Sequence, residues 1–408
     1  TNNTVGTTTY SWTNNASGIG LAAGGTGDIA AFTASNITTA PIVATITVTP
    51  HFDYAGKTCD GPAETFTITV NPAGQVNDPS DQVVCNGAPV TAVNFITNNT
   101  GGTTTYTWTN DQAGIGLAAS GSGNIASFSA INAGTAPVVA TITVTPHFDN
   151  GAPICDGAVQ TFTITVNPTG QVNDPTDQLV CAGSPTATVT FGTMNTVGTT
   201  TYTWTNDLTS IGLAASGSGD IASFNAINAG TAPVVATVTV TPHFAYGSKT
   251  CDGPAQTFTI TVNPKGQVNS ITNKVVCNGS LLAAISFTTN NTGGTTTYTW
   301  TNSDPTIGLA ASGTGDIAAF NAVNLGTSPV IATIAVTPHF DNGVPICDGT
   351  AQTFTITVNP TGQVNALSDQ VVCAGSPTTS VFFTTANTGG TTTYTWTNND
   401  PSIGLAAN

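Results

Sequence analysis

The stretch Thr104-Thr105-Tyr106-Thr107-Trp108-Thr109 decides the fold of this 408-residue chain. Its Tyr and Trp lie two positions apart, so in an extended strand both rings point to one face while the Thr side chains point to the other. That alternation is typical of a half-buried β-strand whose aromatic face covers a core. We therefore expect Trp108 to be a core residue and not an exposed platform for a sugar ring.

The same stretch returns at a constant interval of 96 residues, and the Cys residues keep that interval. A feature that occurs once in every copy more often builds the copy than performs a unique reaction. We expect the Trp of every copy to be a core residue and the function to belong to the array. The Trp positions are Trp12, Trp108, Trp204, Trp300 and Trp396; a first Cys series is Cys59, Cys155, Cys251 and Cys347, and a second is Cys85, Cys181, Cys277 and Cys373.

A unit of about 100 residues is a normal size for one domain. Asn-Pro pairs such as Asn71-Pro72 close the last apolar run of each copy, because Pro cannot continue a central strand. These pairs predict three complete repeats, 74–169, 170–265 and 266–361, with a partial repeat at 1–73 that lacks its first strands and another at 362–408 that holds only first strands. We interpret the sequence as part of a longer array. The alternative, in which the partial repeats of two copies complete each other by strand donation, is less favoured because residues 385–408 repeat residues 1–24.

Within the repeat 74–169, alternating or apolar runs predict short strands separated by turn residues. No segment shows helical periodicity. Six or seven short antiparallel strands in this length indicate an all-β fold, a tandem array of immunoglobulin-like β-sandwich domains. A strand of eight to ten residues then implies roughly 35–45 Å per repeat in an extended string. The expected strands cover residues 82–85, 92–96, 104–109, 125–131, 138–148 and 161–166.

The Cys spacing allows two pairings, one between Cys residues 70 apart within a repeat and one between Cys residues 26 apart across a junction, as in Cys59 with Cys85. We favour the first, because such a bridge can form as its repeat folds. Disulfides require an oxidising, extracytoplasmic setting. The favoured pairs are Cys85 with Cys155, Cys181 with Cys251 and Cys277 with Cys347, while Cys59 and Cys373 pair outside the sequence.

Composition argues against several partners. The net charge is −16 and the chain has only four cationic side chains, all Lys. So few cations cannot neutralise phosphates, so we expect no binding to nucleic acid or to anionic lipid. No apolar run approaches the length of a membrane-spanning helix, and we expect no membrane span.

The repeated polar residues favour structural roles. One His per repeat (His51, His147, His243 and His339) with two Cys leaves a zinc tetrahedron short of a ligand. No Ser stands in an elbow motif, and four equal active sites in a row would be unusual, so we expect no enzyme. The Asp of each Cys-Asp-Gly reads as a turn residue. Gly121-Ser122-Gly123 precedes no helix, which removes the nucleotide-binding reading and leaves no expected cofactor.

Calcium is the one metal for which the sequence offers candidate ligands, at the junctions between repeats. Residues 77–81 and 173–177 are rich in Asp, but the equivalent residues 269–273 and 365–369 lose most of these carboxylates. Calcium needs about six oxygens or more, so solvated turns are the favoured interpretation.

Two features alternate from repeat to repeat. The first-series Cys follows Gly-Lys-Thr at 56–58 and Ser-Lys-Thr at 248–250, but Ala-Pro-Ile at 152–154 and Val-Pro-Ile at 344–346. The residue after the second-series Cys also alternates, as Asn86, Ala182, Asn278 and Ala374. The unit of duplication was therefore a pair of repeats.

The full set of motifs resembles the PKD-like immunoglobulin-fold repeats of giant Bacteroidetes surface proteins over the whole chain. These motifs are Val-Cys-Asn-Gly (84–87), Tyr-Thr-Trp-Thr-Asn (106–110), Ile-Gly-Leu-Ala-Ala-Ser-Gly-Ser-Gly (115–123), Ala-Thr-Ile-Thr-Val-Thr-Pro (140–146), Cys-Asp-Gly (155–157) and Thr-Phe-Thr-Ile-Thr-Val-Asn-Pro (161–168). The resemblance implies a very long adhesin on the bacterial cell surface, of the kind exported by the type IX system and used in gliding motility.

We expect a non-catalytic stalk or filament of such an adhesin, with neighbouring repeats of the same chain as its main partners. Surface or glycan ligands would bind through other regions of the protein. Strands without charge, such as 161–166, also favour association of copies side by side. Two alternatives stay open: a glycan-binding array that uses variable loops such as 111–114 and 207–210, and an accessory region of a large secreted hydrolase.

Overall fold

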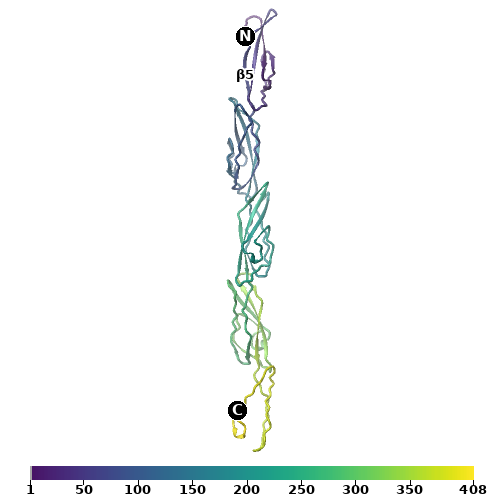
Figure 1. The fold of residues 1–408 in the computed structure, drawn as a ribbon, viewed down its shortest axis with the longest axis vertical. Helices are drawn as coiled ribbons and strands as arrows, with labels where there is room; N and C mark the ends of the chain where they lie inside the picture. The colour runs from purple at the N-terminus through teal and green to yellow at the C-terminus, as the bar shows by residue number, and fades with distance from the viewer. Residues whose placement is uncertain (1) are drawn as a thin grey trace. The chain divides into compact units, whose positions relative to one another are not determined.

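The computed structural model describes residues 2–408, which form β-strands and single 3-10 turns but no α-helix (Figure 1). Two compact units make up the chain. The first comprises Thr1–Asn173, Phe191–Thr203 and Val240–Ala255, and the second Asp174–Thr190, Trp204–Thr239 and Gln256–Asn408. Repeats 74–169 and 266–361 each lie inside one unit, and they show the expected all-β, sandwich-type domain.

The repeat 74–169 contains a large sheet and a small one. The large sheet has the order β6-β13-β11-β8-β9, with β12 paired to β11, and the small sheet pairs β7 with β10. A further bridge between Val93 and Ile125 extends the small sheet. The elements are β6 (Gln82–Cys85), β7 (Pro89–Val90), β8 (Thr103–Asn110), η2 (Ala113–Ile115), β9 (Ser120–Ser122), β10 (Phe128–Ser129), β11 (Val138–Asp149), β12 (Cys155–Asp156) and β13 (Gln160–Asn167).

The other repeats reuse these elements. Repeat 1–73 has β1 (Thr7–Asn14), η1 (Ser17–Ile19), β2 (Gly24–Thr26), β3 (Ile42–Tyr54), β4 (Lys57–Asp60) and β5 (Glu64–Val70). Repeat 170–265 has β14 (Gln178–Cys181), β15 (Thr199–Asn206), η3 (Thr209–Ile211), β16 (Ser216–Ser218), β17 (Val234–Tyr246), β18 (Lys249–Asp252) and β19 (Gln256–Asn263). Repeat 266–361 has β20 (Lys274–Cys277), β21 (Leu281–Leu282), β22 (Thr295–Asn302), η4 (Pro305–Ile307), β23 (Ser312–Thr314), β24 (Phe320–Asn321), β25 (Val330–Asp341), β26 (Cys347–Asp348) and β27 (Gln352–Asn359), and η5 (Pro401–Ile403) follows in 362–408.

The first strand of the complete repeats departs from the expected antiparallel pattern. β6 pairs in parallel with β13, with Cys85 opposite Asn167. Consequently β13 lies between β6 and β11 and is not an edge strand. Residues 164–166 of the uncharged run are therefore paired on both sides, and the Thr163 amide donates to Asp81, so the run gives little support to association of copies side by side.

The expected strands at 92–96 and 125–131 are mostly irregular. Pairing begins before the first expected strand, at β7, whereas in the second only β10 and the Val93–Ile125 bridge form. Apolar patterning places these segments on the core correctly, since Val93 and Ile125 are buried, but it does not fix how many residues form ladders.

The core lies under the aromatic face of β8, as the alternation predicts. Trp108 is 7% exposed, and its register partner on β9 is Gly121. A Cβ atom on Gly121 would lie 2.2 Å from the Trp108 ring, so only glycine leaves room for the indole. The Gly-x-Gly stretch thus serves packing. Trp12, Trp204 and Trp300 are buried in the same way.

Tyr106 packs beside Trp108 on the same face. Its ring lies 5.4 Å from that of Phe95, centroid to centroid, a distance at which aromatic pairs attract. Burial raises the pKa of Tyr106, and a hydrogen bond with Thr97 offsets part of that rise. Tyr298 repeats this environment in repeat 266–361, where burial again raises its pKa. Both hydroxyls therefore stay protonated at neutral pH.

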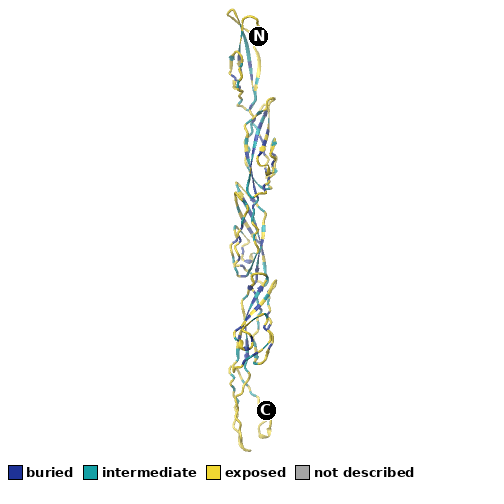
Figure 2. Cartoon of the chain, turned by 180° about the vertical axis from the view of Figure 1, so that it is seen from behind, coloured by how far each residue is buried: buried dark blue, intermediate teal, exposed yellow. Residues whose placement is uncertain are grey.

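Trp396 corrects the expectation of five core Trp residues, because it is 38% exposed. Residues 391–398 have the sequence of β22, Thr-Thr-Thr-Tyr-Thr-Trp-Thr-Asn, yet they form no strand. β22 pairs with β25, and no described strand takes that place beside 391–398. Exposed residues accordingly dominate 362–408 in Figure 2. The octapeptide is a strand in this structure where a partner strand lies beside it.

Replacing Trp108 with Ala should destabilise repeat 74–169 by about 3–5 kcal/mol, because loss of a buried indole leaves a cavity. Hydrogen–deuterium exchange at β8 and β11 measures this loss as faster opening. The matched control is Trp396→Ala, which removes the same side chain from an exposed position and should change stability by less than about 0.5 kcal/mol. Equal effects of the two substitutions would contradict the core role of Trp108.

Candidate functional site at the joints between repeats

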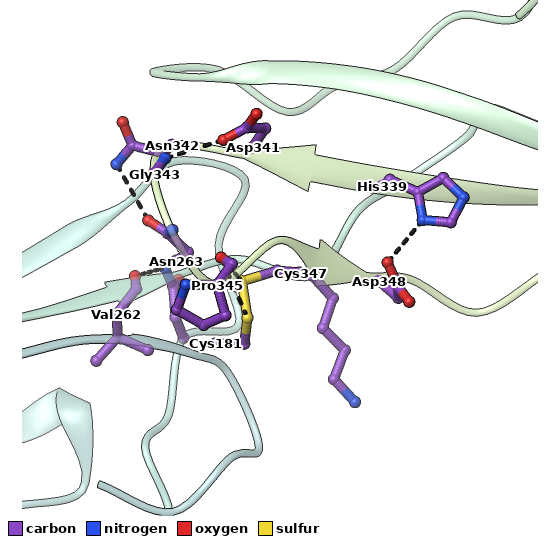
Figure 3. Close-up of a disulfide and its surroundings, with 12 residues drawn as sticks. Cys181, Val262, Asn263, His339, Asp341, Asn342, Gly343, Pro345, Cys347 and Asp348 are labelled. Atoms are coloured by element: carbon purple, nitrogen blue, oxygen red, sulfur yellow. Dashed lines mark hydrogen bonds and ion pairs between the residues drawn. A yellow bond between two sulfur atoms is a disulfide. The ribbon is translucent and has the colours of Figure 1, made fainter. Parts of the chain in front are cut away.

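Both disulfides of the structure join neighbouring repeats. Cys85 is bonded to Cys251 and Cys181 to Cys347; the partners are 166 positions apart in the sequence, with Cα–Cα distances of 5.5 and 5.4 Å. Those distances suit a disulfide. Figure 3 shows the bridge between Cys181 and Cys347. The structure therefore corrects both the favoured pairing and its alternative. The pairs it contradicts are Cys85 with Cys155, Cys181 with Cys251, Cys277 with Cys347, and Cys59 with Cys85.

The sheet register explains why a bridge within a repeat cannot form. Cys85 lies opposite Asn167 at one end of the large sheet, beside the pair Val138–Val166. Cys155 lies opposite Phe148, at the other end of β11. About ten residues of β11 separate these ends, which is roughly 33 Å at about 3.3 Å per residue. A disulfide needs Cα atoms within about 7 Å of each other, so Cys85 must find its partner elsewhere.

The other four Cys residues are free thiols in this chain. Cys155 is partly buried and the remaining three are exposed. For each of them, a partner 166 residues away would lie outside residues 1–408. They are Cys59, Cys155, Cys277 and Cys373.

An Asn side chain clamps each repeat to the one before it. Asn291 Oδ1 accepts a hydrogen bond from the Gln267 amide at 2.6 Å, and its Nδ2 donates to the carbonyls of Thr231 at 3.3 Å and Lys265 at 3.2 Å. The Thr292 amide also donates to the Thr231 carbonyl, at 2.9 Å. Thr231 belongs to the preceding repeat, so the side chain ties together both repeats and the linker between them. Equivalent bonds surround Asn99, Asn195 and Asn387.

A second Asn, at the end of each last strand, contacts the hairpin that precedes the first-series Cys of the next repeat. Asn263 is fully buried, and its Oδ1 accepts from Asn342 Nδ2 at 3.1 Å (Figure 3). Asn71 accepts likewise from Asn150 at 3.3 Å. Asn167 instead donates to a backbone carbonyl, that of Tyr246, at 2.9 Å.

The joints thus come in two chemical kinds, which follow the alternation in the sequence. Cys85, followed by Asn86, meets a Lys-Thr-Cys hairpin across its joint, whereas Cys181, followed by Ala182, meets a Pro-Ile-Cys hairpin. Each residue type after the second-series Cys goes with one hairpin type of the following repeat. The pair of repeats is the period because neighbouring joints differ.

Glycine holds the linker against the Cys-Asp-Gly turn. The Gly170 amide donates to the Cys251 carbonyl at 3.2 Å. A Cβ atom on Gly253 would lie 1.7 Å from the Gly170 carbonyl oxygen, so no larger residue fits there. The turn that carries the first-series Cys therefore also packs against the linker.

The recurrent His links three strands on the outer face of the large sheet. In repeat 74–169 the Nδ1 atom of His147 lies 2.6 Å from Asp156 Oδ1 and its Nε2 atom lies 2.8 Å from Thr107 Oγ1. The Asp of Cys-Asp-Gly is therefore more than a turn residue, because it fixes β12 to β11. Sequence reasoning missed this contact, although the shared 96-residue period of the His and the Asp was its signal.

In repeat 1–73 a Ser occupies the hydroxyl position, giving a Ser–His–Asp connectivity. Ser11 Oγ lies 2.7 Å from His51 Nε2, and His51 Nδ1 lies 2.5 Å from Asp60 Oδ1. Ser11 is nevertheless in the middle of β1 and pairs on both sides, with β2 and with β3. In the elbow motif the nucleophilic Ser lies on a sharp turn beside amides that are free to bind an oxyanion. The setting favours a structural brace, and Thr serves equally well in the other repeats.

The acidic turns near the joints also act inside their own repeat. Asp81 Oδ1 accepts a hydrogen bond from the Thr163 amide at 2.6 Å, and Asp177 does the same for Thr259. Asn273 replaces the acid in repeat 266–361 and accepts from Thr355 at 2.9 Å. An acceptor oxygen is what the position requires. Residues 2–408 contain no group of three His, Cys, Asp or Glu side chains placed to hold a metal, and no helix suited to cross a membrane.

Comparisons with known proteins find only weak similarity. No protein-family model matches the sequence, and no curated protein matches it. Among solved structures, mouse cadherin-23 EC22–24 is similar at 13% identity and a TM-score of 0.34, covering 69% of this chain and 96% of that one. Drosophila N-cadherin EC1–4 matches at 12% identity and 0.29, covering 86% and 92%, and Sidekick-1 immunoglobulin domains 1–5 at 12% and 0.25, covering 88% and 73%. At these TM-scores the similarity carries no weight for function.

Replacing Asn291 with Ala should loosen the joint between repeats 170–265 and 266–361. The substitution removes the side-chain partner of the Gln267 amide and of the Lys265 carbonyl and one of the two donors to the Thr231 carbonyl, at a cost of about 1–3 kcal/mol. Exchange of the Gln267 and Thr292 amides should therefore accelerate about tenfold or more, because each 1.4 kcal/mol is a factor of ten. Asn290→Ala, at the exposed neighbouring position, is the control and should leave both rates unchanged. Unchanged exchange rates in the Asn291 variant would show that Asn291 does not hold the two repeats together.

Proposed function

We propose that this chain is a segment of the stalk of a long, repetitive bacterial cell-surface adhesin, which holds a binding region away from the cell and catalyses no reaction. The observation that carries the proposal is that disulfides join neighbouring repeats, Cys85 to Cys251 and Cys181 to Cys347. The specialised chemistry of the chain lies at its joints. A chain built in this way is suited to hold a binding region at a distance and to bear force.

The location follows from the same bridges. Disulfides persist in oxidising surroundings, which for a bacterium means outside the cytoplasm. A net charge of −16 keeps such a chain soluble and discourages contact with anionic surfaces. The resemblance to Bacteroidetes surface repeats supports the bacterial origin and export through the type IX system.

The glycan-binding alternative finds less support in the repeats themselves. Sugar platforms need exposed aromatic rings, but the Trp of each of the first four repeats is buried. The variable loops also stabilise the fold. Asp111 accepts a hydrogen bond from the Thr141 amide at 2.7 Å, and Asp207 accepts one from the Thr237 amide at the same distance. Adhesive contacts would then belong to other regions of the protein.

Immuno-electron microscopy of intact producing cells tests the proposal. Antibodies raised against residues 74–361 should label the outside of the cell, at distances from the outer membrane that vary from particle to particle along projecting stalks. A preimmune serum gives the background. Label confined to the cytoplasm, or held uniformly against the membrane, would contradict a projecting stalk.

A further inference from the structure

The two disulfides interlace along the sequence. Cys181 lies inside the loop that Cys85–Cys251 closes, and Cys251 lies inside the loop that Cys181–Cys347 closes. Bridges within repeats would close separate loops. In the observed arrangement, residues 181–251 belong to both loops at once.

Interlacing places three chain segments side by side in the covalent path between the bridges. Segments 85–181, 181–251 and 251–347 each connect the first bridge to the second. The shortest is 181–251, about 70 residues long. At about 3.5 Å per residue it extends to roughly 245 Å, whereas the unbridged chain from residue 85 to residue 347 extends to roughly 910 Å.

The bridges are placed to survive while the repeats are folded. Cys251 and Cys347 are each 1% exposed. Thiol exchange requires a thiolate to reach one of the two sulfur atoms. With one sulfur of each pair covered, only the half-buried partners, Cys85 and Cys181, remain open to attack.

We propose that the interlaced disulfides make the chain a covalent tension element, in which pulling cannot unravel the repeats one after another. This purpose rests on the proposed stalk function. When a core between the bridges yields, extension stops once segment 181–251 is fully extended, because the two longer segments are still slack at that length. Reduction of the bridges would release the hidden length.

Single-molecule force spectroscopy on the whole chain, pulled from its two ends, tests the interlacing. The free Cys residues are first replaced by Ser in every variant, which prevents reshuffling. The four variants compared have both bridges, only Cys85–Cys251, only Cys181–Cys347, or neither. The contour length of the fully unfolded chain is read, so a variant with lowered stability still reports its bridges.

The interlaced arrangement predicts lengths that do not add. Each single bridge should shorten the unfolded chain by 166 residues, about 580 Å at about 3.5 Å per residue. Both together should shorten it by only about 190 residues, or about 670 Å, and not by the sum of about 1,160 Å. Reductant should abolish every difference between variants.

A shortening of only about 70 residues in the variant that keeps all four bridge Cys residues, as a bridge from Cys181 to Cys251 within one repeat would give, would overturn the inference. Four equal lengths before reduction would do the same. This outcome can be told apart from failure of the proposed function. If the unfolded lengths fit interlaced bridges but the protein is absent from the cell surface, only the stalk function is contradicted. Surface stalks whose four-Cys variant shortens by only about 70 residues would contradict the tension element and leave the stalk function standing.

Discussion

The parallel pairing of β6 with the end of β13 is the contact on which the joints depend. It sets Cys85 opposite Asn167, the last residue of its repeat's final strand, and the Asn86 amide donates to the Asn167 carbonyl at 2.8 Å. The second-series Cys therefore sits where the next repeat begins. The same register recurs between Cys181 and Asn263 and between Cys277 and Asn359, so it is a property of the repeat itself. With β6 in any other position the bridges to the next repeat could not close.

The repeats also show how far strand formation depends on partners. One octapeptide sequence forms β22 when β25 pairs with it and remains irregular at 391–398, where it has no such partner. The β-propensity of Thr, Tyr and Trp is too weak to hold an isolated strand. Each large sheet takes all its strands from one repeat, so a strand such as β22 depends on the other strands of its own repeat.

Much of the fold could be predicted from the sequence because its period is exceptionally regular. Alternation located β8, β11 and β13 within one residue at each end, and the 96-residue spacing predicted that the same set of strands recurs along the chain. The Cys pairing could not be predicted from spacing, because separation along the chain does not say at which end of a sheet a residue lies. One signal did point to the joints: the residue after the second-series Cys goes with the hairpin type of the following repeat. The roles of the His and of the Cys-Asp-Gly Asp needed the register of β11 against β8 and β12, which is a tertiary property.

The most direct test of a stalk joined across its repeats is mass spectrometry of peptides prepared without reduction. The peptides around each Cys differ in sequence, since Gln-Val-Val-Cys85-Asn and Gln-Leu-Val-Cys181-Ala can be told apart, as can Ser-Lys-Thr-Cys251 and Val-Pro-Ile-Cys347. The account predicts that Cys85 is recovered bound to Cys251 and Cys181 bound to Cys347. Recovery of Cys85 bound to Cys155, or of Cys181 bound to Cys251, would contradict it.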